Sequence, residues 1–227
     1  MKSVVVGSGG REHALAHVLG RDSDVTVTPG NPGIPNSTTQ SPLNIDADLF
    51  VIGPEAPLVD GLADQLRAQG KTVFGPGVDG AQLEGSKAWM KDLLVEANVP
   101  TAKHGTFTNE DEAIAFLSDM PLPYVIKTDG LAAGKGVIVT ESVNEAKDAI
   151  KNYLSGDAFG DAGKTVVIEE GLIGNEISIL AICDGTKAVP LAPAQDYKRL
   201  LNNDEGPNTG GMGAYSPIPS VLSLIHI

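Results

Sequence analysis

Four short apolar runs near the start of the chain each end in a loop rich in glycine or proline, and this pattern constrains the fold more than any other feature. The runs are Val4–Val6, Val25–Thr28, Leu49–Ile52 and Thr72–Phe74. Helical patterns stand between them at Glu12–Leu19 and at about Val59–Ala68. Strands that alternate with helices favour a parallel α/β sheet, with functional loops at the carboxyl ends of its strands. We therefore predict a parallel-sheet domain over residues 1–80.

One crossover in this domain shows no helical pattern. Between Gly33 and the third run the chain has only Ile34–Asp48, and this segment is rich in Pro, Ser, Thr and Asn. A parallel crossover that includes a helix needs roughly 10–12 residues with helical periodicity. We expect an abbreviated loop here, or one helix fewer on the sheet.

From about Ala81 the pattern changes to one rich in antiparallel strands. The predicted helices are Ser86–Glu96, Asn109–Leu117 and Val143–Leu154. The predicted strands are Tyr124–Lys127, Val137–Thr140, Thr165–Glu169, Glu176–Cys183 and Ala188–Leu191. We interpret residues 81–122 as a helical linker, 123–192 as an α+β module and 193–219 as the start of a further lobe.

A glycine-rich loop joins two of these strands. It contains Gly130, Gly134, Lys135 and Gly136, so a phosphate chain can approach its backbone N–H groups closely while a lysine adds charge. The loop is not a Walker A motif, because a strand beginning at Val137 follows it instead of a Ser or Thr and a helix. We predict a hairpin flap over phosphates, with Lys127 aimed at the same groups. The alternative is a flexible turn with incidental lysines.

The segment Ile168–Glu176 resembles a strand that leaves one lobe and enters another. Backbone groups at such a crossing can recognise an adenine edge, and carboxylates there can accept ribose hydroxyls. A solvated acidic turn is an equally good interpretation of these residues alone.

The glycine turn after the first apolar run, Gly7–Gly10, stands between a strand and a helix. A dinucleotide-binding motif would need a third glycine where Glu12 stands, and an acid where the second strand ends at Thr28. A mononucleotide-like phosphate at the helix N-terminus, assisted by Arg11, is the better interpretation. His13 and His17 lie one turn apart, but no third metal ligand suggests itself.

Composition excludes several classes of function. The net charge of −13, from 29 acidic and 16 basic residues, argues against nucleic-acid or acidic-membrane binding. Cys183 is the single cysteine, so no disulfide framework or cysteine metal cluster is expected. No apolar run approaches the roughly 20 residues of a membrane span, and we expect a cytoplasmic protein.

Five motifs together resemble one family. They are Gly7–His13, Gly53–Val59, Gln82–Lys87, Asp129–Val137 and Gly206–Pro217. Over residues 1 to about 219 the chain resembles the phosphoribosylamine–glycine ligases (GAR synthetases), which are ATP-grasp enzymes of purine biosynthesis. The resemblance implies an α/β fold: a Rossmann-like (pre-ATP-grasp) N-terminal domain, an α+β ATP-grasp small subdomain and an incomplete large lobe.

The resemblance also implies a reaction and a set of site residues. ATP would phosphorylate the carboxylate of glycine, and the nitrogen of 5-phosphoribosylamine would attack the acyl phosphate, with Mg²⁺ (or Mn²⁺) present. The implied ATP-binding residues are Lys87, Lys127, Gly130, Gly134, Lys135, Gly136, Glu169, Glu170, Leu172 and Glu176. The implied substrate-binding residues are Gly9, Gly10, Arg11, Glu12, Glu55, Asp60, Asp196, Lys198, Arg199, Asn208, Thr209, Gly210 and Gly211. The segment Asn208–Gly213 is expected to form a loop that closes the substrate side, and the full-length protein is expected to be a monomer.

The end of the chain departs from the family pattern. The resemblance implies that the full-length protein continues further and carries the Glu and Asn that hold the metal, so we expect the metal ligands beyond residue 227 and this chain to be inactive. Residues 220–227 do not resemble the family, and Leu222–Ile227 resembles a translated sequencing adapter. After the glycine ligase itself, the alternatives are a non-catalytic ATP-binding fragment and another ATP-grasp carboxylate–amine ligase. A dinucleotide-binding oxidoreductase is a distant fourth hypothesis.

Overall fold

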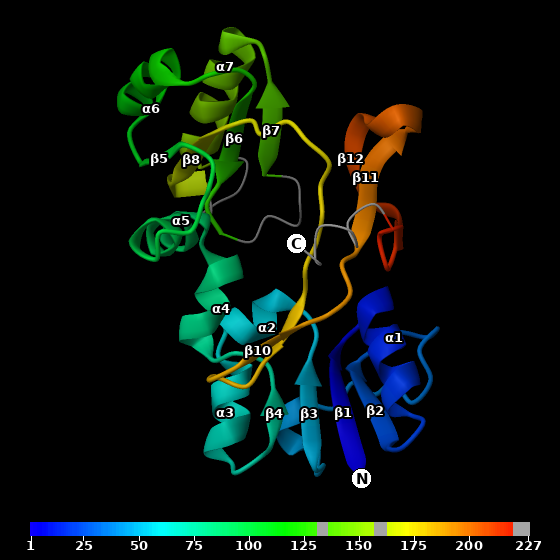
Figure 1. Ribbon diagram of the computed structural model, residues 1–227. Helices are drawn as coiled ribbons and strands as arrows, with labels where there is room; N and C mark the ends of the chain where they lie inside the picture. The colour runs from blue at the N-terminus through cyan, green and yellow to red at the C-terminus, as the bar shows by residue number, and fades with distance from the viewer. Residues whose placement is uncertain (131–135, 157–162, 220–227) are drawn as a thin grey trace.

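A computed structural model describes residues 1–130, 136–156 and 163–219 of the chain (Figure 1). The predicted residues Gly134 and Lys135, and the segment 220–227, lie outside these ranges. In the part that is described, no helix is long and apolar enough to cross a membrane.

The N-terminal lobe is built on the predicted parallel sheet, which is confirmed. Its strands are β1 (Lys2–Gly7), β2 (Asp24–Pro29), β3 (Leu49–Ile52) and β4 (Val73–Phe74), paired in parallel in the order β2-β1-β3-β4. The valines of β1 and Phe50 of β3 are fully buried, because strands covered on both faces can be apolar throughout. Because β1 and β3 are parallel neighbours in the sheet, their carboxyl ends lie side by side.

The short crossover is also confirmed. Helix α1 (Gly10–Leu19) joins β1 to β2, whereas between β2 and β3 the chain contains only the short 3-10 helix η1 (Pro42–Asn44). The segment instead follows the edge of the sheet, where Val27 N donates to Asn36 O at 3.1 Å and Thr38 N donates to Val27 O at 2.9 Å. Pairing with the edge strand satisfies backbone groups that a helix would otherwise have satisfied.

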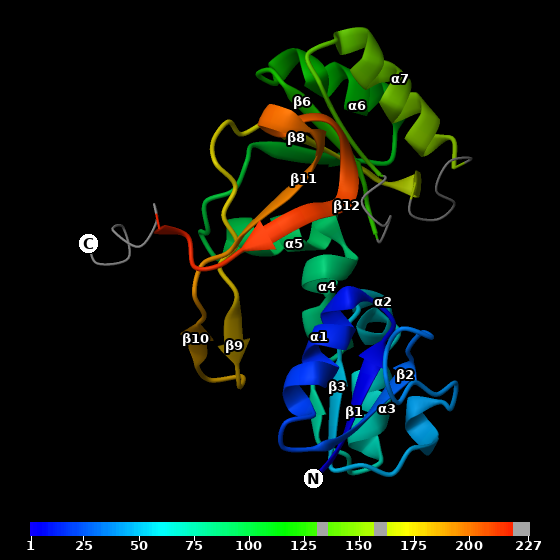
Figure 2. The same ribbon diagram turned by 90° about the vertical axis from the view of Figure 1, so that its right-hand side faces the viewer.

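The helix predicted over about Val59–Ala68 is confirmed from Leu62 to Ala68, but its predicted start was wrong. The structure has α2 (Glu55–Val59) and α3 (Leu62–Ala68), which are separated by Gly61 at φ 82°. A left-handed residue cannot continue a right-handed helix, and glycine adopts this conformation without a Cβ penalty. An additional helix, α4 (Val78–Gly85), leads into α5 (Lys87–Glu96) and connects the two lobes in Figures 1 and 2.

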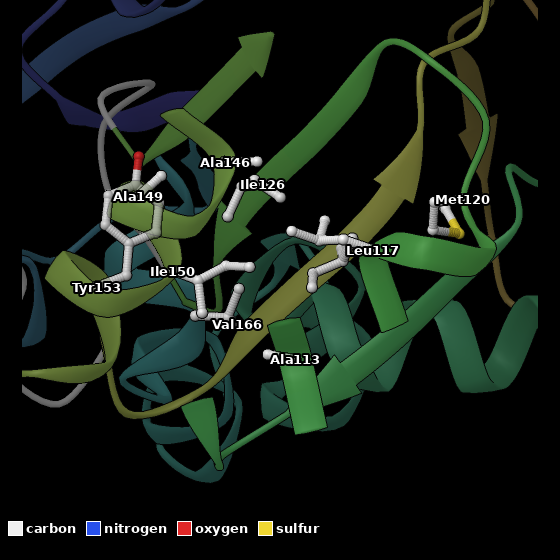
Figure 3. Close-up of a cluster of buried hydrophobic side chains, with 10 residues drawn as sticks. Ala113, Leu117, Met120, Ile126, Ala146, Ala149, Ile150, Tyr153 and Val166 are labelled. Atoms are coloured by element: carbon white, nitrogen blue, oxygen red, sulfur yellow. The ribbon is translucent and has the colours of Figure 1, made fainter. Parts of the chain in front are cut away.

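The second lobe contains the antiparallel module that the sequence predicts. Its strands are β5 (His104–Phe107), β6 (Tyr124–Thr128), β7 (Val137–Thr140) and β8 (Val166–Glu170), paired antiparallel in the order β5-β8-β6-β7. Helices α6 (Glu110–Phe116) and α7 (Val143–Leu154), with the 3-10 helix η2 (Leu117–Asp119), cover one face. Ile126, Val166 and Ile168 meet Leu117 and Ile150 in the core of this lobe, part of which is drawn in Figure 3.

The remaining strands form two hairpins. The first pairs β9 (Ala181–Cys183) with β10 (Ala188–Pro190), and the second pairs β11 (Gln195–Leu201) with β12 (Glu205–Tyr215) across the 3-10 helix η4 (Asn202–Asp204). The strand predicted over Glu176–Cys183 is therefore wrong before Ala181.

The prediction of a loop over Asn208–Gly213 was wrong as well, because these residues belong to β12. Glycine disfavours strands when only local propensity counts, but here the long partner strand supplies the hydrogen bonds and aromatic contacts. The rings of Tyr197 and Tyr215 stack across the pair with their centroids 6.2 Å apart.

Candidate functional site

On two neighbouring strands of the second lobe, core side chains and charged side chains lie on opposite faces of the sheet. Successive side chains of a strand point to opposite faces of the sheet. On β6 and β8, Ile126 and Ile168 face the helices, so Lys127 and Glu169 face the other way. Glu169 stands opposite Val125, and Lys127 is two residues further along β6, which makes it a diagonal neighbour of Glu169. Its Nζ lies 3.0 Å from Glu169 Oε1.

A second lysine reaches the same carboxylate from α5. Lys91 Nζ lies 3.0 Å from Glu169 Oε2 and donates to Thr101 Oγ1 at 2.7 Å. The side chains of Lys91 and Glu169 are only 5% and 7% exposed, whereas that of Lys127 is 26% exposed. Burial raises the pKa of the Glu169 carboxyl, but the two ammonium groups outweigh burial and leave this pKa below its ordinary value. Glu169 is therefore a buried carboxylate with one enclosed and one accessible cation.

Glu169 Oε1 is buried and makes no hydrogen bond of good geometry, although the Lys127 ammonium lies 3.0 Å from it. A buried acceptor without a donor carries a free-energy cost that a ligand N–H can remove. This orphaned oxygen, beside an accessible lysine, fits a ligand that carries both an amino group and negative charge.

The start of α5 is attached to the end of β6, just before the glycine-rich loop. Asp129 accepts a hydrogen bond from Ser86 Oγ at 3.0 Å and from Ala88 N at 3.2 Å. A residue that follows β6 therefore helps to cap the N-terminus of α5. Lys87 Nζ donates to Gly130 O at 2.7 Å, and Gly130 has φ 85°. Burial is the main cause that lowers the pKa of Lys87. These contacts place two of the predicted phosphate-binding residues, Lys87 and Gly130, together.

The predicted hairpin around the loop is confirmed at both of its ends. Lys127 pairs with Val137 in the β6–β7 ladder, and Thr128 N donates to Gly136 O at 2.9 Å. β6 and β7 are therefore antiparallel neighbours up to Thr128 and Gly136, and residues 131–135 lie outside the described ranges. Gly136 is buried at the mouth of this hairpin.

The other predicted adenine and ribose residues are not gathered around Glu169. Glu170 Oε1 accepts a hydrogen bond from Lys103 N at 2.8 Å, which places this carboxylate beside the start of β5. Leu172 is 75% exposed. Glu176 forms an ion pair with Lys198, so the structure joins a predicted ATP residue to a predicted substrate residue.

The other predicted substrate residues after Glu176 lie on the β11–β12 hairpin. Lys198 Nζ is also 3.5 Å from Asp196 Oδ2, and its backbone oxygen accepts a hydrogen bond from Thr209 Oγ1 at 2.8 Å. Asn208 pairs with Arg199 across the hairpin. Gly210 and Gly211 follow on β12, where Gly211 N donates to Thr209 Oγ1 at 3.0 Å.

A second cluster stands at the carboxyl ends of β1 and β3. The Glu12 side chain accepts from Gly9 N at 2.7 Å and from Arg11 Nε at 2.9 Å, and Arg11 Nη1 lies 3.0 Å from Glu55 Oε1. Burial raises the pKa of Glu12, but the hydrogen bonds from Arg11 and Gly9 outweigh burial and lower it. The structure thus brings four predicted substrate residues together, while Gly10 begins α1 and Asp60 ends α2 at an exposed position.

The Glu12 carboxylate is wedged between two glycines. A Cβ on Gly53 would lie 2.2 Å from Glu12 Oε1, and one on Gly7 would lie 2.4 Å from Glu12 Cγ. The anion at the start of α1 is therefore a side chain of the protein itself. This carboxylate occupies the amide of Gly9 at the helix N-terminus where the phosphate was predicted, while the side chains of Arg11 and Glu55 are 55% and 42% exposed.

Three residues at these clusters were missed by sequence reasoning. Lys91 is four residues after Lys87 on the same helical face, which was a usable signal. Asp129 begins one of the five family motifs, but its contacts had no signal, because its partners lie 41 and 43 residues away. Asn31 donates through Nδ2 to Ser8 O at 2.7 Å and accepts from Gly33 N at 2.7 Å, and its position between proline–glycine pairs could have suggested a structural turn.

Among the described residues, no group of three or more His, Cys, Asp or Glu side chains could hold a metal ion. His13 and His17 line a small hollow beside Ser23 and Asn36 without forming such a group.

Comparisons with known proteins agree with this architecture. Solved structures with the same fold include the D-alanyl-alanine synthetase A of Vibrio cholerae, with a TM-score of 0.65 at 14% identity over 99% of this chain and 78% of that one. Another is a RimK domain ATP-grasp protein of Sphaerobacter thermophilus, with a TM-score of 0.62 at 17% identity over 98% of this chain and 78% of that one. The family model that matches residues 85–225 describes an ATP-grasp domain, which places the chain in the ATP-grasp class.

Family models narrow this class. The phosphoribosylglycinamide synthetase N domain matches residues 1–84, and the ATP-grasp (A) domain of the same synthetase matches residues 85–225. The chain belongs to the phosphoribosylglycinamide synthetase family.

Individual relatives of this family are similar over all of this chain. The phosphoribosylamine–glycine ligase of Xylella fastidiosa strain 9a5c is 50% identical, with 100% of this chain and 56% of the relative aligned. The ligase of Escherichia coli K12 is 47% identical, with 57% of it aligned. The crystal structure of the Thermotoga maritima ligase has a TM-score of 0.83 at 34% identity, over 100% of this chain and 59% of that one. The chain spans a little over half the length of the relatives it matches.

Proposed function

We propose that this chain is the nucleotide- and amine-binding part of an ATP-dependent ligase that joins glycine to 5-phosphoribosylamine. The products would be glycinamide ribonucleotide, ADP and phosphate. The observation that carries the proposal is the buried Glu169 carboxylate, whose Oε1 lies beside Lys127 on the strand that leads into the glycine-rich loop, in a chain of this family.

These residues fit ATP by their chemistry. The 6-amino group of adenine would donate to Glu169 Oε1, and the phosphates would meet the ammonium groups of Lys127 and Lys87 and the loop from Gly130 to Gly136. We also assign Gly134 and Lys135 to the phosphates, and Glu170, Leu172 and Glu176 to the rim of the adenine and ribose pocket. ATP would transfer its terminal phosphoryl group to an oxygen of the glycine carboxylate. That oxygen would later leave as part of phosphate.

The side chains of this chain would position the reactants and neutralise charge. The nitrogen of the amine forms a bond to the glycine carbonyl carbon, the C–O bond to phosphate breaks, and a nitrogen proton is released. Lys87 and Lys127 would offset negative charge on the phosphates, a role that needs preorganised cations rather than covalent catalysis.

The amine substrate is assigned to the N-terminal cluster and to the β11–β12 hairpin. Arg11 and Glu55 present a charged donor and a carboxylate at the ends of β1 and β3, where ligands of parallel sheets bind. Asp60 is assigned to the same side, and Gly9, Gly10 and Glu12 would shape it. Asp196, Lys198, Arg199, Asn208, Thr209, Gly210 and Gly211 are assigned to the opposite side.

A divalent metal, Mg²⁺ or Mn²⁺, belongs to the proposal through the family. We assign its ligands to the part of the relatives that this chain does not span.

The test is a glycine-dependent ligase assay. The 227-residue chain would be compared with a chimera that adds the remaining portion of the Xylella fastidiosa relative. We expect ADP and glycinamide ribonucleotide from the chimera only when ATP, glycine, phosphoribosylamine and Mg²⁺ are all present. A folded chimera that releases ADP equally well without glycine, or with another amino acid, would contradict the proposal. Product formation by the 227-residue chain would refute the placement of the metal ligands.

A second candidate, a non-catalytic ATP-binding module, is favoured for the isolated chain by the missing metal cluster in its described part. ATP binding without product formation by the 227-residue chain would support it.

A further inference from the structure

Lys91 is a buried lysine that neither the motif comparison nor the proposed reaction uses. Its side chain is 5% exposed, so no ligand in a surface cleft can contact it extensively. Burying an ammonium group is costly unless it is paired and hydrogen-bonded. Lys91 meets both requirements, through Glu169 Oε2 at 3.0 Å and Thr101 Oγ1 at 2.7 Å.

The two oxygens of Glu169 have different surroundings. Oε2 meets the enclosed Lys91, whereas Oε1 meets the more exposed Lys127 and makes no hydrogen bond of good geometry. A carboxylate held at one oxygen has its plane and its second oxygen fixed in space. Fixing an acceptor before a ligand arrives lowers the entropy cost of the contact that it makes.

Lys91 also maintains charge balance around this carboxylate. If Lys127 turns toward a phosphate, Glu169 loses one of its two cations. Lys91 cannot follow, because it belongs to α5 and is enclosed, so it remains as the counter-charge. Removing one partner of a buried pair leaves a charge uncompensated, and the carboxylate then reorients or takes up a proton.

We propose that Lys91 is a positioning residue for nucleotide selection: by holding Glu169 Oε2, it aims Oε1 at a hydrogen-bond donor on the purine. This inference rests on the proposed ATP site. The chemical group that it selects is an exocyclic amino group. A purine with a keto oxygen at the same position would present an acceptor to a carboxylate oxygen, and so would bind less well.

The experiment compares two nucleotides that differ only in the group at C6 of the purine and in the proton that the neighbouring N1 carries when C6 is a keto group. Equilibrium dialysis would give the Kd of the 227-residue chain for ATP and for inosine 5′-triphosphate, which has the same ribose and triphosphate. The variants are Lys91→Met, Lys91→Gln and Lys91→Arg. The control is Lys71→Met, which removes a pair of similar length, Lys71 Nζ to Asp46 Oδ1 at 2.9 Å, in the N-terminal lobe.

We expect the parent to prefer ATP, and Lys91→Met to weaken ATP binding about tenfold but inosine triphosphate binding less than about threefold. Lys91→Arg should keep most of the preference, and Lys71→Met all of it. Equal losses for both nucleotides, or an unchanged preference in a folded Lys91→Met or Lys91→Gln chain, would overturn the inference alone. A folded parent that binds neither nucleotide would overturn this inference together with the proposed ATP site.

Discussion

Lys127 Nζ and Glu169 Oε1 lie 3.0 Å apart across the β6–β8 pair, on the face of the sheet that α6 and α7 do not cover. The lysine is the more exposed partner, so it can exchange the carboxylate for a ligand anion at little cost in burial. Lys91 reaches the same carboxylate from α5, and because it is enclosed it cannot make this exchange. One carboxylate therefore links a fixed cation to an exchangeable one.

The Lys127→Ala variant tests the exchangeable cation. We expect ATP binding to weaken by roughly 1.5–3 kcal/mol, which is about 10- to 150-fold, because a charge-assisted contact to phosphate is lost. Lys103→Ala is the matched control, since Lys103 Nζ donates to Asp119 O and Lys103 is exposed. Calorimetric titration measures both, and equal affinities of the two folded variants would remove Lys127 from the site.

The Gly53→Ala variant tests whether the Glu12 carboxylate packs directly against Gly53. A Cβ at this position meets Glu12 Oε1 at 2.2 Å, so we expect a loss of about 1–3 kcal/mol in the free energy of unfolding. Gly10→Ala is the control, because a Cβ there meets nothing within 4 Å. Urea denaturation measures the two side by side. A Gly53→Ala chain as stable as the Gly10→Ala chain would show that the Glu12 carboxylate does not occupy this position.

Acid should destabilise the chain through Glu12 and Glu169. Both folded-state pKa values lie below the ordinary value of 4.5, so each carboxylate stabilises the fold above that pH. This stabilisation is lost as the pH falls through the folded pKa, because the unfolded chain takes up protons first. We expect the free energy of unfolding to be level above about pH 6 and to fall below about pH 4.5. In the Glu169→Gln variant the fall over the same range should be shallower, and an equal slope would contradict the assignment.

The Asp129→Ala variant tests the link between α5 and the glycine-rich hairpin. It removes the acceptor for Ser86 Oγ and Ala88 N, and we expect a loss of about 1–2 kcal/mol in the free energy of unfolding. Asp148→Ala on the exposed side of α7 serves as the control, with an expected change within about 0.5 kcal/mol. Thermal denaturation by circular dichroism distinguishes the two, and equal midpoints would mean that the link contributes nothing.

Sequence patterns predicted the parts of the fold that depend on local periodicity. The parallel sheet followed from apolar runs such as Val4–Val6, and α7 from Val143–Leu154 with correct bounds. The missing helix before Leu49 followed from the composition of the crossover. Such features are encoded within a few residues, so a single chain is enough to recognise them.

The features that were wrong or missed depend on distant partners. β12 is rich in glycine and becomes a strand because β11 pairs with it, and the break at Gly61 separates α2 from α3 within an apparently continuous pattern. In the candidate site, Lys127 and Glu169 could be named from motifs. The contacts of Lys91 and Asp129 could not, because they join helices to strands that are remote in the sequence.

The alternation along β6 also separates two kinds of evolutionary constraint. Ile126 is in the core, and its sequence neighbours Val125 and Lys127 face the charged side. A saturation scan of Tyr124–Thr128, scored for abundance and for nucleotide binding, should therefore show a period of two. Replacements on one face would reduce the amount of folded protein, and replacements on the other would change ligand preference at constant amount. A lineage could alter what this sheet recognises one residue at a time while its folding stayed intact.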